Sequence, residues 1–325
     1  MNLCILLPVY NDWSCLPRLL RELDQSLLAS DAFATVVILN DGGDPPRNSA
    51  DFIDCEYRRL RDFRMIELVR NLGNQNALAV GLSFIRDHVE CDAVVVMDSD
   101  GQDSPTDLPQ LLSAHCEHPQ ALITAERSGR SEGLLFRICY RIYRWAFIAL
   151  TGKRLTFGNY SVIPAECLGR LCIMSELPTN FAAALIKSRV PIHCVPCHRA
   201  ARFDGVSSQN FVTLTIHGIN GISVFSEIAL VRISLFSIVI IAVTLAGITA
   251  VSSIRLFTSL ATPGWASTVV GALLILMFQA LLLSLVAIVV RVQRPMSLVV
   301  DPTGYKRAIG SERRIVARQM GLPAA

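Results

Sequence analysis

Two aspartates one residue apart follow an apolar run in the first third of the chain. The run Val94–Met97 is followed at once by Asp98 and Asp100, with Gln102 two residues further on. Such a run predicts a buried strand of a parallel sheet, and open α/β sheets bind ligands at the carboxyl ends of these strands. Oxygen donors there suit Mg²⁺ or Mn²⁺, held by one or two side chains together with substrate phosphates. An acidic turn that caps the following helix is the alternative interpretation.

The segments around this pair alternate between the two kinds of regular structure. Apolar runs predict strands over residues 3–8, 35–39, 65–69, 93–97 and 121–125. Helical spacing of apolar residues predicts helices over 74–88 and 108–115, and a helix capped by Ser14 that runs to residue 28. This order predicts an α/β fold with a doubly wound, mostly parallel sheet.

Two long uncharged segments near the C-terminus explain a mean hydropathy of +0.44. Residues 233–251 and 266–290 are each long enough to cross a bilayer as a helix. Basic residues flank the pair on the outside, whereas the link between the segments carries only Arg255. Positive charge stays on the cytoplasmic side, so we expect an inner-membrane, multi-pass protein with a cytosolic catalytic domain. The expected parts are a cytosolic domain over 1–210, an amphipathic juxtamembrane helix over 211–231, a hairpin over 232–291 and a cytosolic tail over 292–325.

The N-terminus and the net charge indicate which targeting signals and partners to expect. The chain begins with a strand-like segment and no basic leader, so no signal peptide is expected. A net charge of +3 gives no reason to expect a nucleic-acid partner. A basic, aromatic helix predicted over 136–150 either lies on an anionic membrane surface or packs internally with solvated arginines.

Ten cysteines are scattered through the chain, without the regular spacing of a disulfide framework. The segment Cys194–His198 has the C-x-x-C-H spacing of haem c attachment. We expect neither haem nor zinc there, because haem c is attached outside the cytosol and no second metal-binding pair follows. The alternation of Val190, Ile192 and Cys194 predicts a strand instead.

Several short segments match, in order, the motifs of one enzyme family. Pro8-Val9-Tyr10-Asn11-Asp12 matches P-V-Y-N-E, and Asn40-Asp41-Gly42-Gly43 is similar to D-D-G-S. The other matches are Arg70–Leu78 to R-N-F-G-K-E-A-A-L, Asp98–Pro105 to D-A-D-L-Q-D-P-P, Arg199–Ser207 to R-x-x-R-x-x-G-x-S, and Arg294-Pro295 to an R-P after the anchor. The chain therefore resembles the family 2 glycosyltransferases of GT-A fold. More narrowly, it is similar to the polyprenyl-phosphate glycosyltransferases with a C-terminal two-helix anchor, a group that includes the dolichol-phosphate mannose synthases.

The resemblance implies a nucleotide-sugar donor, UDP- or GDP-linked, and a Mg²⁺ or Mn²⁺ cofactor. It implies a metal site of Asp98, Asp100 and Gln102, with Asp98 holding either the ion or the ribose, and catalytic roles for Asp98, Asp100 and Arg202. The implied donor site consists of Pro8, Tyr10, Asn11, Asp41, Gly73, Asp98, Arg199, Arg202 and Ser207. The alternative for Asp41 is a turn residue, and for the two arginines a solvated basic loop.

The expected acceptor depends on whether the chain carries a general base for a sugar hydroxyl. Family members that act on sugar hydroxyls carry an E-D pair, and the comparable stretch Ser175–Phe181 offers only Glu176. A lipid phosphate is already ionised near neutral pH and needs no base. We therefore expect a polyprenyl (undecaprenyl) phosphate acceptor at the cytosolic membrane face.

Departures from the family motifs keep two alternatives open: a hydroxyl-directed transferase, and a catalytically inactive relative that acts as a membrane scaffold or partner subunit. These departures are Asn40, Asn74, Ser161 and Ser208. Small residues on the spans, such as Gly247 and Gly271, would permit a homo-oligomer. The sugar and the base of the donor cannot be identified from the motifs.

Overall fold

The structure is a computed structural model that describes residues 1–44, 56–128, 134–198, 200–204, 211–257, 264–293 and 303–316. The chain forms two compact units. The first comprises Met1–Cys139, Leu155–Val224 and Leu298–Ala325, and the second comprises Tyr140–Arg154 and Phe225–Ser297.

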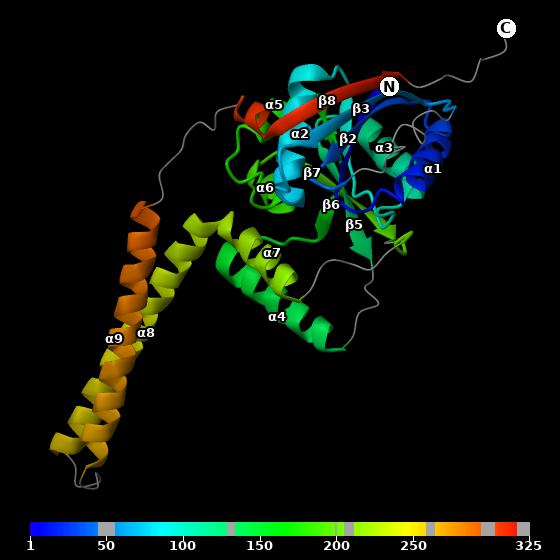
Figure 1. The fold of residues 1–325 in the computed structure, drawn as a ribbon. Helices are drawn as coiled ribbons and strands as arrows, with labels where there is room; N and C mark the ends of the chain where they lie inside the picture. The colour runs from blue at the N-terminus through cyan, green and yellow to red at the C-terminus, as the bar shows by residue number, and fades with distance from the viewer. Residues whose placement is uncertain are drawn as a thin grey trace. The chain divides into compact units, whose positions relative to one another are not determined.

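An eight-stranded sheet forms the centre of the first unit (Figure 1). Its spatial order is β7-β5-β6-β4-β1-β2-β3-β8. Parallel pairs join β1 to β2 and β4, β2 to β3, and β5 to β7, whereas β6 and β8 run antiparallel to their neighbours. The mostly parallel α/β sheet predicted from the sequence is therefore confirmed. The strands are β1 (Asn2–Val9), β2 (Phe33–Asn40), β3 (Leu60–Leu68), β4 (Ala93–Val96), β5 (Leu122–Ser128), β6 (Phe157–Pro164), β7 (Ile192–His198) and β8 (Ile309–Val316).

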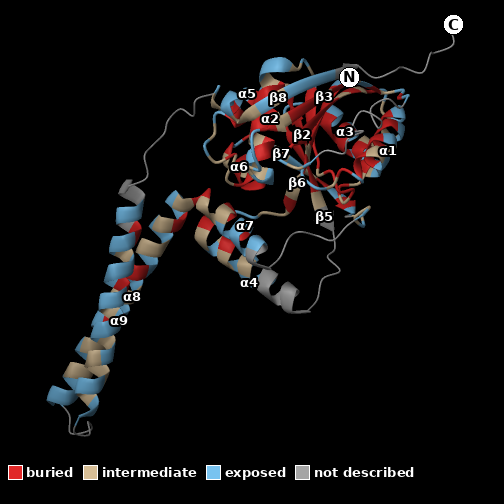
Figure 2. Ribbon diagram, in the orientation of Figure 1, coloured by how far each residue is buried: buried red, intermediate tan, exposed pale blue. Residues whose placement is uncertain are grey.

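Helices cover both faces of this sheet, which makes its central strands apolar on both sides. Helices α1 (Leu16–Leu28) and α3 (Leu108–Glu117) pack on one face, and α2 (Asn74–His88), α5 (Ala165–Cys172) and α6 (Phe181–Lys187) pack on the other. In β1, for example, Ile5 belongs to the first core and Leu6 to the second. Figure 2 shows the sheet as the most deeply buried part of this unit. The elements that complete the unit are α7 (Phe211–Ser223) and the short 3₁₀ helices η1 (Pro105–Asp107) and η2 (Gly304–Ala308).

The start of α1 differs from the sequence prediction. The predicted cap Ser14 is wrong, because the helix begins at Leu16 with Cys15 as the N-cap and no side-chain capping bond. A proline near the start of the helix has no N–H to be capped. The Ser14 hydroxyl instead donates to the Asp204 carboxylate at 3.2 Å.

An edge strand close to the C-terminus was not predicted. β8 pairs antiparallel with β3, and the four consecutive polar residues Ser311–Arg314 leave it without an apolar run to identify it. Arg314 binds Asp62 at 2.8 Å, and the Ser311 hydroxyl donates to Glu67 at 2.7 Å. Just before β8, the Tyr305 hydroxyl donates to Asp87 at 2.7 Å. The chain that follows the apolar helices is thereby joined to the first unit.

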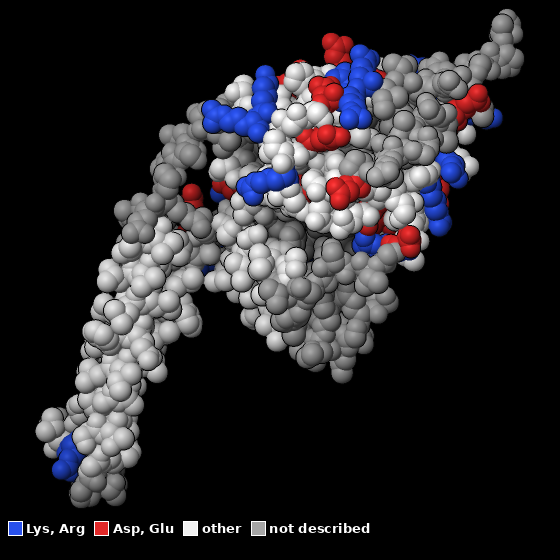
Figure 3. Space-filling view, viewed as in Figure 1, with Lys and Arg blue, Asp and Glu red and all other residues white. Residues whose placement is uncertain are grey.

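The second unit contains two helices long and apolar enough to cross a membrane, by length and composition. They are α8 (Ser226–Phe257) and α9 (Trp265–Gln293), and the apolar windows that identify them both have a mean hydropathy of 2.6. Most of their side chains are exposed (Figure 2), and Figure 3 shows a surface almost without charge along the hairpin. The predicted spans 233–251 and 266–290 lie within these helices. The single juxtamembrane helix expected over 211–231 is instead divided, since α7 ends at Ser223 and α8 begins at Ser226.

The last part of α4 (Leu134–Thr151) packs against the start of α8 within the second unit. Phe147 is 2% exposed and meets the Phe225 ring edge-on, with ring centroids 6.1 Å apart. Arg232 donates to the last carbonyls of α4, at 2.8 Å to Ala149 and 3.2 Å to Ile148. The other side of α4 leaves Trp145 76% exposed. This helix therefore presents an aromatic, basic face to the surroundings.

Candidate active site

The predicted site residues gather where three parallel strands end. The register pairs Val9 of β1 with Asn40 of β2, and Leu6 of β1 with Val96 of β4. The residues that follow these strands therefore share one edge of the sheet. Tyr10 and Asn11, after β1, are exposed, whereas Pro8 accepts a hydrogen bond from the Ser99 hydroxyl at 2.9 Å.

Asp41 is buried directly after β2. Its carboxylate accepts the Leu72 backbone N–H at 2.7 Å, and its own N–H donates to the Val9 carbonyl at 2.8 Å. Burial raises the pKa of Asp41, although the backbone N–H groups of Leu72 and Gly73 act in the opposite direction. Gly73 has φ +82°, a backbone conformation that favours glycine. Asp41 therefore fixes the loop that leads into α2.

The loop after β4 is folded around the second aspartate. Asp100 is 8% exposed, and its Oδ1 accepts the Gln102 N–H at 2.9 Å. Burial and then the charge of Asp98 raise the pKa of Asp100, while Arg202 acts to lower it. Gly101 has φ +82°, and a side chain there would collide with the Phe203 ring.

Arg202 reaches this carboxylate from a segment about a hundred positions later in the sequence. Its Nη1 lies 3.4 Å from Oδ2 of Asp100, and its Nη2 bonds to Asp12. The adjacent backbone is tied to the same loop, because Phe203 N–H donates to the Asp100 carbonyl at 3.1 Å and Ala200 N–H to the Gln102 carbonyl at 3.1 Å. Asp12, which the sequence analysis did not single out, is thus a member of the site.

Two neutral side chains contact Asp98, and a third contacts one of these two. The amide nitrogens of Asn74 and Asn159 lie 3.3 Å and 3.2 Å from Oδ1 of Asp98. Gln75 in turn lies 3.5 Å from the Asn159 oxygen. No role was predicted for Gln75 or Asn159 from the sequence, although Gln75 lies within the matched segment Arg70–Leu78.

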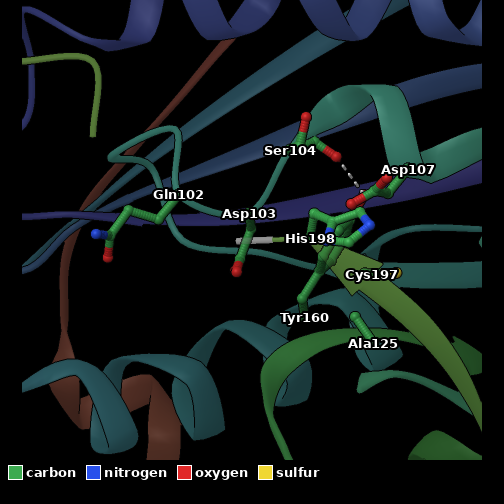
Figure 4. Close-up of a pocket in the computed structure, with 8 residues that line it drawn as sticks. All are labelled: Gln102, Asp103, Ser104, Asp107, Ala125, Tyr160, Cys197 and His198. Atoms are coloured by element: carbon green, nitrogen blue, oxygen red, sulfur yellow. Dashed lines mark hydrogen bonds between the residues drawn. The ribbon is translucent and has the colours of Figure 1, made fainter. Parts of the chain in front are cut away.

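A small cavity is lined in part by the loop that follows β4 (Figure 4). Its volume is about 10 Å³, room for about one water molecule. Asp103 accepts the Asp98 N–H at 3.0 Å, and the Tyr160 hydroxyl donates to the Ser104 carbonyl at 3.1 Å. The lining residues are Gln102, Asp103, Ser104, Asp107, Ala125, Tyr160, Cys197 and His198.

The C-x-x-C-H segment contributes Cys197 and His198 to this cavity. It lies on β7, where Cys197 is 5% exposed in the core and the Thr124 hydroxyl donates to Cys194 at 3.4 Å. Burial, together with Asp107 and Asp103, raises the pKa of Cys197 to about 12, so the thiol stays protonated near neutral pH.

Two predicted donor-site residues, Arg199 and Ser207, lie outside the described residues. Asp98 lies close enough for its charge to act on Asp100, and Gln102 contacts Asp100 through its backbone N–H. The described residues contain no cluster of three His, Cys, Asp or Glu side chains suited to a metal. Two carboxylates and an amide fit an ion that takes its remaining ligands from phosphates and water. The Arg202 guanidinium on Asp100 also shows that this carboxylate face accepts a cation.

The family model for glycosyl transferase family 2 matches residues 4–172, more than half of the 325-residue chain. The chain belongs to glycosyltransferase family 2. The matched region contains every site residue described above except Arg202 and its neighbours.

The chain is also similar to individual transferases and to a solved structure of a synthase. Two undecaprenyl-phosphate 4-deoxy-4-formamido-L-arabinose transferases, from Enterobacter sp. and Klebsiella pneumoniae, are 26% and 24% identical over 223 residues. The matches cover 65% of this chain and 63% of each relative, so the chain spans less than two thirds of their length. Glucosyl-3-phosphoglycerate synthase from Mycobacterium tuberculosis, solved with Mn²⁺, UDP-glucose and phosphoglyceric acid, has a TM-score of 0.52 at 16% identity. It covers 70% of this chain and 79% of its own, and this likeness confirms the GT-A type of fold.

Proposed function

We propose that the chain is a membrane-anchored, metal-dependent, inverting glycosyltransferase. It transfers a sugar from a UDP- or GDP-sugar to undecaprenyl phosphate or a similar polyprenyl phosphate. The observation that carries the proposal is the convergence of Asp98, Asp100 and Arg202 at the carboxyl edge of the sheet, in a chain that also has two helices apolar enough to span a membrane. The acceptors and metal named for the relatives and the structural neighbour support the same assignment.

The reaction makes one bond and breaks one. An oxygen of the acceptor phosphate attacks the anomeric carbon from the face opposite the nucleotide, and the bond from that carbon to the nucleoside diphosphate breaks. Mg²⁺ or Mn²⁺, held by Asp98, Asp100 and Gln102, would neutralise the charge that develops on the leaving diphosphate. Arg202 would bind a phosphate oxygen with its forked guanidinium once the donor replaces its contact with Asp100.

No side chain is required to take a proton in this reaction, because a phosphate acceptor is ionised near neutral pH. Glu176, the nearest candidate for a base, already binds Lys187 at 2.8 Å. Burial alone would raise the pKa of Glu176, but the hydrogen bond and charge of Lys187 outweigh burial and lower it. A carboxylate held in an ion pair is a poor proton acceptor, which favours the lipid phosphate over a sugar hydroxyl.

The anchor and the aromatic helix fit a substrate in the bilayer. We propose that α8 and α9 cross the inner membrane as a multi-pass anchor, with the first unit in the cytosol. The exposed face of α4, with Trp145, Ile142 and Arg144, would lie in the anionic interface, where aromatic and basic side chains are favoured. Both features would place the second unit in the membrane that holds a lipid phosphate.

The test is transfer of a radiolabelled sugar by the purified full-length protein. A panel of UDP- and GDP-sugars is supplied with undecaprenyl phosphate in detergent, with Mn²⁺ or with excess chelator. We expect a labelled lipid with one donor class and none in chelator. Transfer to a soluble sugar alone would support the hydroxyl-directed alternative. Absence of transfer with every donor would support the inactive membrane scaffold.

A further inference from the structure

Asp98 and Asp100 are held in chemically different ways, although they are one residue apart. Asp100 pairs with the guanidinium of Arg202, whereas Asp98 is bonded through Oδ1 to the amides of Asn74 and Asn159. Among the described residues, neither lysine nor arginine forms an ion pair with Asp98. Position 74 is a lysine in the motif that this segment resembles, so the neutral contact is a property of this chain.

The amides around Asp98 form a chain of hydrogen bonds whose direction is fixed at both ends. At one end, the Phe181 N–H donates to Oε1 of Gln75 at 2.6 Å. The Gln75 nitrogen therefore faces the oxygen of Asn159, and the Asn159 nitrogen faces Asp98. An N–H can only donate and a carboxylate can only accept, so neither amide can turn over without losing a bond.

The end of this hydrogen-bond series at Phe181 is rigid. Phe181 is fully buried at the first turn of α6, and the helix is capped by the Asn180 side chain, which accepts the Ala183 N–H at 2.9 Å. α6 therefore transmits its position through Gln75 and Asn159 to one oxygen of Asp98. Asn74 bonds to the same oxygen, so both amides hold Oδ1 of Asp98 and neither donates to Oδ2.

We infer that Gln75 and Asn159 are positioning residues that orient Asp98 for the metal-bound donor through an amide relay from the N-terminus of α6. This inference rests on the proposed function. The relay holds Asp98 without neutralising it, so the carboxylate keeps its charge for the ion or the ribose. Mutation of a residue that hydrogen-bonds to a metal ligand typically lowers metal affinity or activity by about 10–100-fold.

Gln75→Glu tests the direction of the relay. Glutamate still accepts the Phe181 N–H, so α6 keeps its contact, but it has no N–H to offer Asn159. The Asn159 amide then turns to donate to residue 75 and presents its oxygen to Asp98. We expect both Mn²⁺ affinity, measured with the metal alone by electron paramagnetic resonance, and kcat to fall by about 10–100-fold.

Asn76→Asp is the matched control, because it makes the same change of charge one residue along the same helix. Asn76 donates to the Leu72 carbonyl at 2.8 Å and lies outside the relay. We expect its Mn²⁺ affinity and kcat to stay within about 3-fold of the wild type, the size of an exposed electrostatic effect. Equal losses in Gln75→Glu and Asn76→Asp would overturn the inference.

A second variant gives a rescue that a merely structural role would not produce. In Gln75→Glu combined with Asn159→His, an imidazolium can donate one N–H to residue 75 and the other to Asp98. We expect the double variant to recover part of the lost kcat and Mn²⁺ affinity. Losses that simply multiply those of the single variants would refute the relay.

A spectroscopic readout separates this inference from the proposed function. In full-length protein labelled with ¹⁵N-asparagine, the side-chain signal of Asn159 is expected to shift in Gln75→Glu and to stay in place in Asn76→Asp. An unchanged Asn159 signal in Gln75→Glu would refute the relay, even in an active enzyme. A wild type that binds no Mn²⁺ and transfers no sugar would refute the proposed function, while the signal of Asn159 still decides the relay.

Discussion

The Nη1 atom of Arg202 lies 3.4 Å from Oδ2 of Asp100, although the two residues are far apart in the sequence. The same guanidinium bonds to Asp12 after β1, so one cation joins three segments of the chain. The Arg202 side chain is 19% exposed and that of Asp100 is 12% exposed, which limits screening by solvent. Arg202 therefore occupies the carboxylate face that the proposed metal and donor phosphates require, and donor binding must move it.

Arg202→Lys should impair transfer more than a simple exchange of cations would. Lysine keeps the charge but loses the fork that reaches Asp12 and Asp100 together and later a phosphate. We expect kcat/KM to fall by about 10-fold or more, as a lost charged hydrogen bond would predict. Steady-state transfer kinetics measure this, with Arg18→Lys as the control, since Arg18 contacts the Phe203 ring at 4.0 Å and pairs with Glu22 at 2.8 Å rather than with a carboxylate of the site. Equal kinetics in the two variants would contradict the role of Arg202.

Asp100→Asn should separate activity from stability. The pKa of Asp100 is raised in the folded protein, chiefly by burial, so the folded state binds its proton more tightly than the unfolded state. Protonated Asp100 is favoured in the folded protein at low pH, and this advantage is lost as the pH rises from the usual aspartate range through the raised pKa. At neutral pH the buried, ionised carboxylate therefore lowers the stability of the folded protein. Asparagine removes the penalty, so we expect Tm at pH 7 to be unchanged or higher.

The same variant removes a negative ligand, so we expect transfer to fall by about 100-fold or more, the order of a lost charge-stabilising contact. Thermal unfolding and the transfer assay are measured on one preparation. Asp204→Asn is the control for the loop, because the Asp204 carboxylate accepts the Ser14 hydroxyl at 3.2 Å and lies two residues from Arg202. Full activity of Asp100→Asn would rule out its proposed metal role.

Asp87→Asn tests the attachment of the chain that follows the membrane helices. Hydrogen bonds from Arg86 and then Tyr305 lower the pKa of Asp87 to about 2. A depressed pKa contributes stability that is present above the usual aspartate value and is lost as the pH falls toward about 2. We expect the variant to unfold at a lower temperature at pH 7 and to show a smaller drop between pH 5 and pH 3, a window of about two units around the ordinary value.

Circular dichroism melts at several pH values make this measurement. Tyr305→Phe removes the same contact from the other side, so the two variants should not add. A pH dependence of Asp87→Asn equal to that of the wild type would contradict the role of the Tyr305 contact.

Local sequence signals predicted the elements that carry the site. The strands β1 and β4 were predicted from their apolar runs, and α2 from the helical spacing of its apolar residues. These patterns were sufficient because the buried residues of each element are apolar in its own sequence. The two aspartates after β4 were recognisable because the carboxyl end of a parallel strand is where open α/β sheets bind ligands. In the same way, two uncharged segments identified α8 and α9 without any knowledge of their neighbours.

Other parts depend on contacts between distant segments, which one sequence does not display. β8 consists largely of polar residues and becomes a strand through its pairing with β3. Asp12, Gln75 and Asn159 became part of the site only when the fold brought them to Arg202 or Asp98. Asn40 looked like a damaged motif, but its side chain closes the turn by bonding both the N–H and the carbonyl of Gly43, at 2.9 Å and 3.0 Å.

Cysteine labelling of intact cells tests the proposed orientation. Cys116 is exposed on the first unit and should react with a membrane-impermeant maleimide only after the membrane is permeabilised. A cysteine introduced at Ser259, between the two apolar helices, should react without permeabilisation. Labelling of Cys116 in intact cells would overturn the cytosolic assignment of the first unit.

Glu176→Gln addresses the identity of the acceptor. If a lipid phosphate is the nucleophile, no enzyme carboxylate takes a proton, and the variant loses only its ion pair with Lys187, which lies 2.8 Å away. Both partners are partly exposed, so we expect kcat to change by less than about 3-fold, in line with the small energies of such pairs. Lys187→Met is the control, because it breaks the same ion pair and leaves the carboxylate in place. If Glu176 were a base, kcat would collapse in Glu176→Gln by about 100-fold and survive in Lys187→Met. That ordering would point to a hydroxyl acceptor and refute the polyprenyl-phosphate assignment.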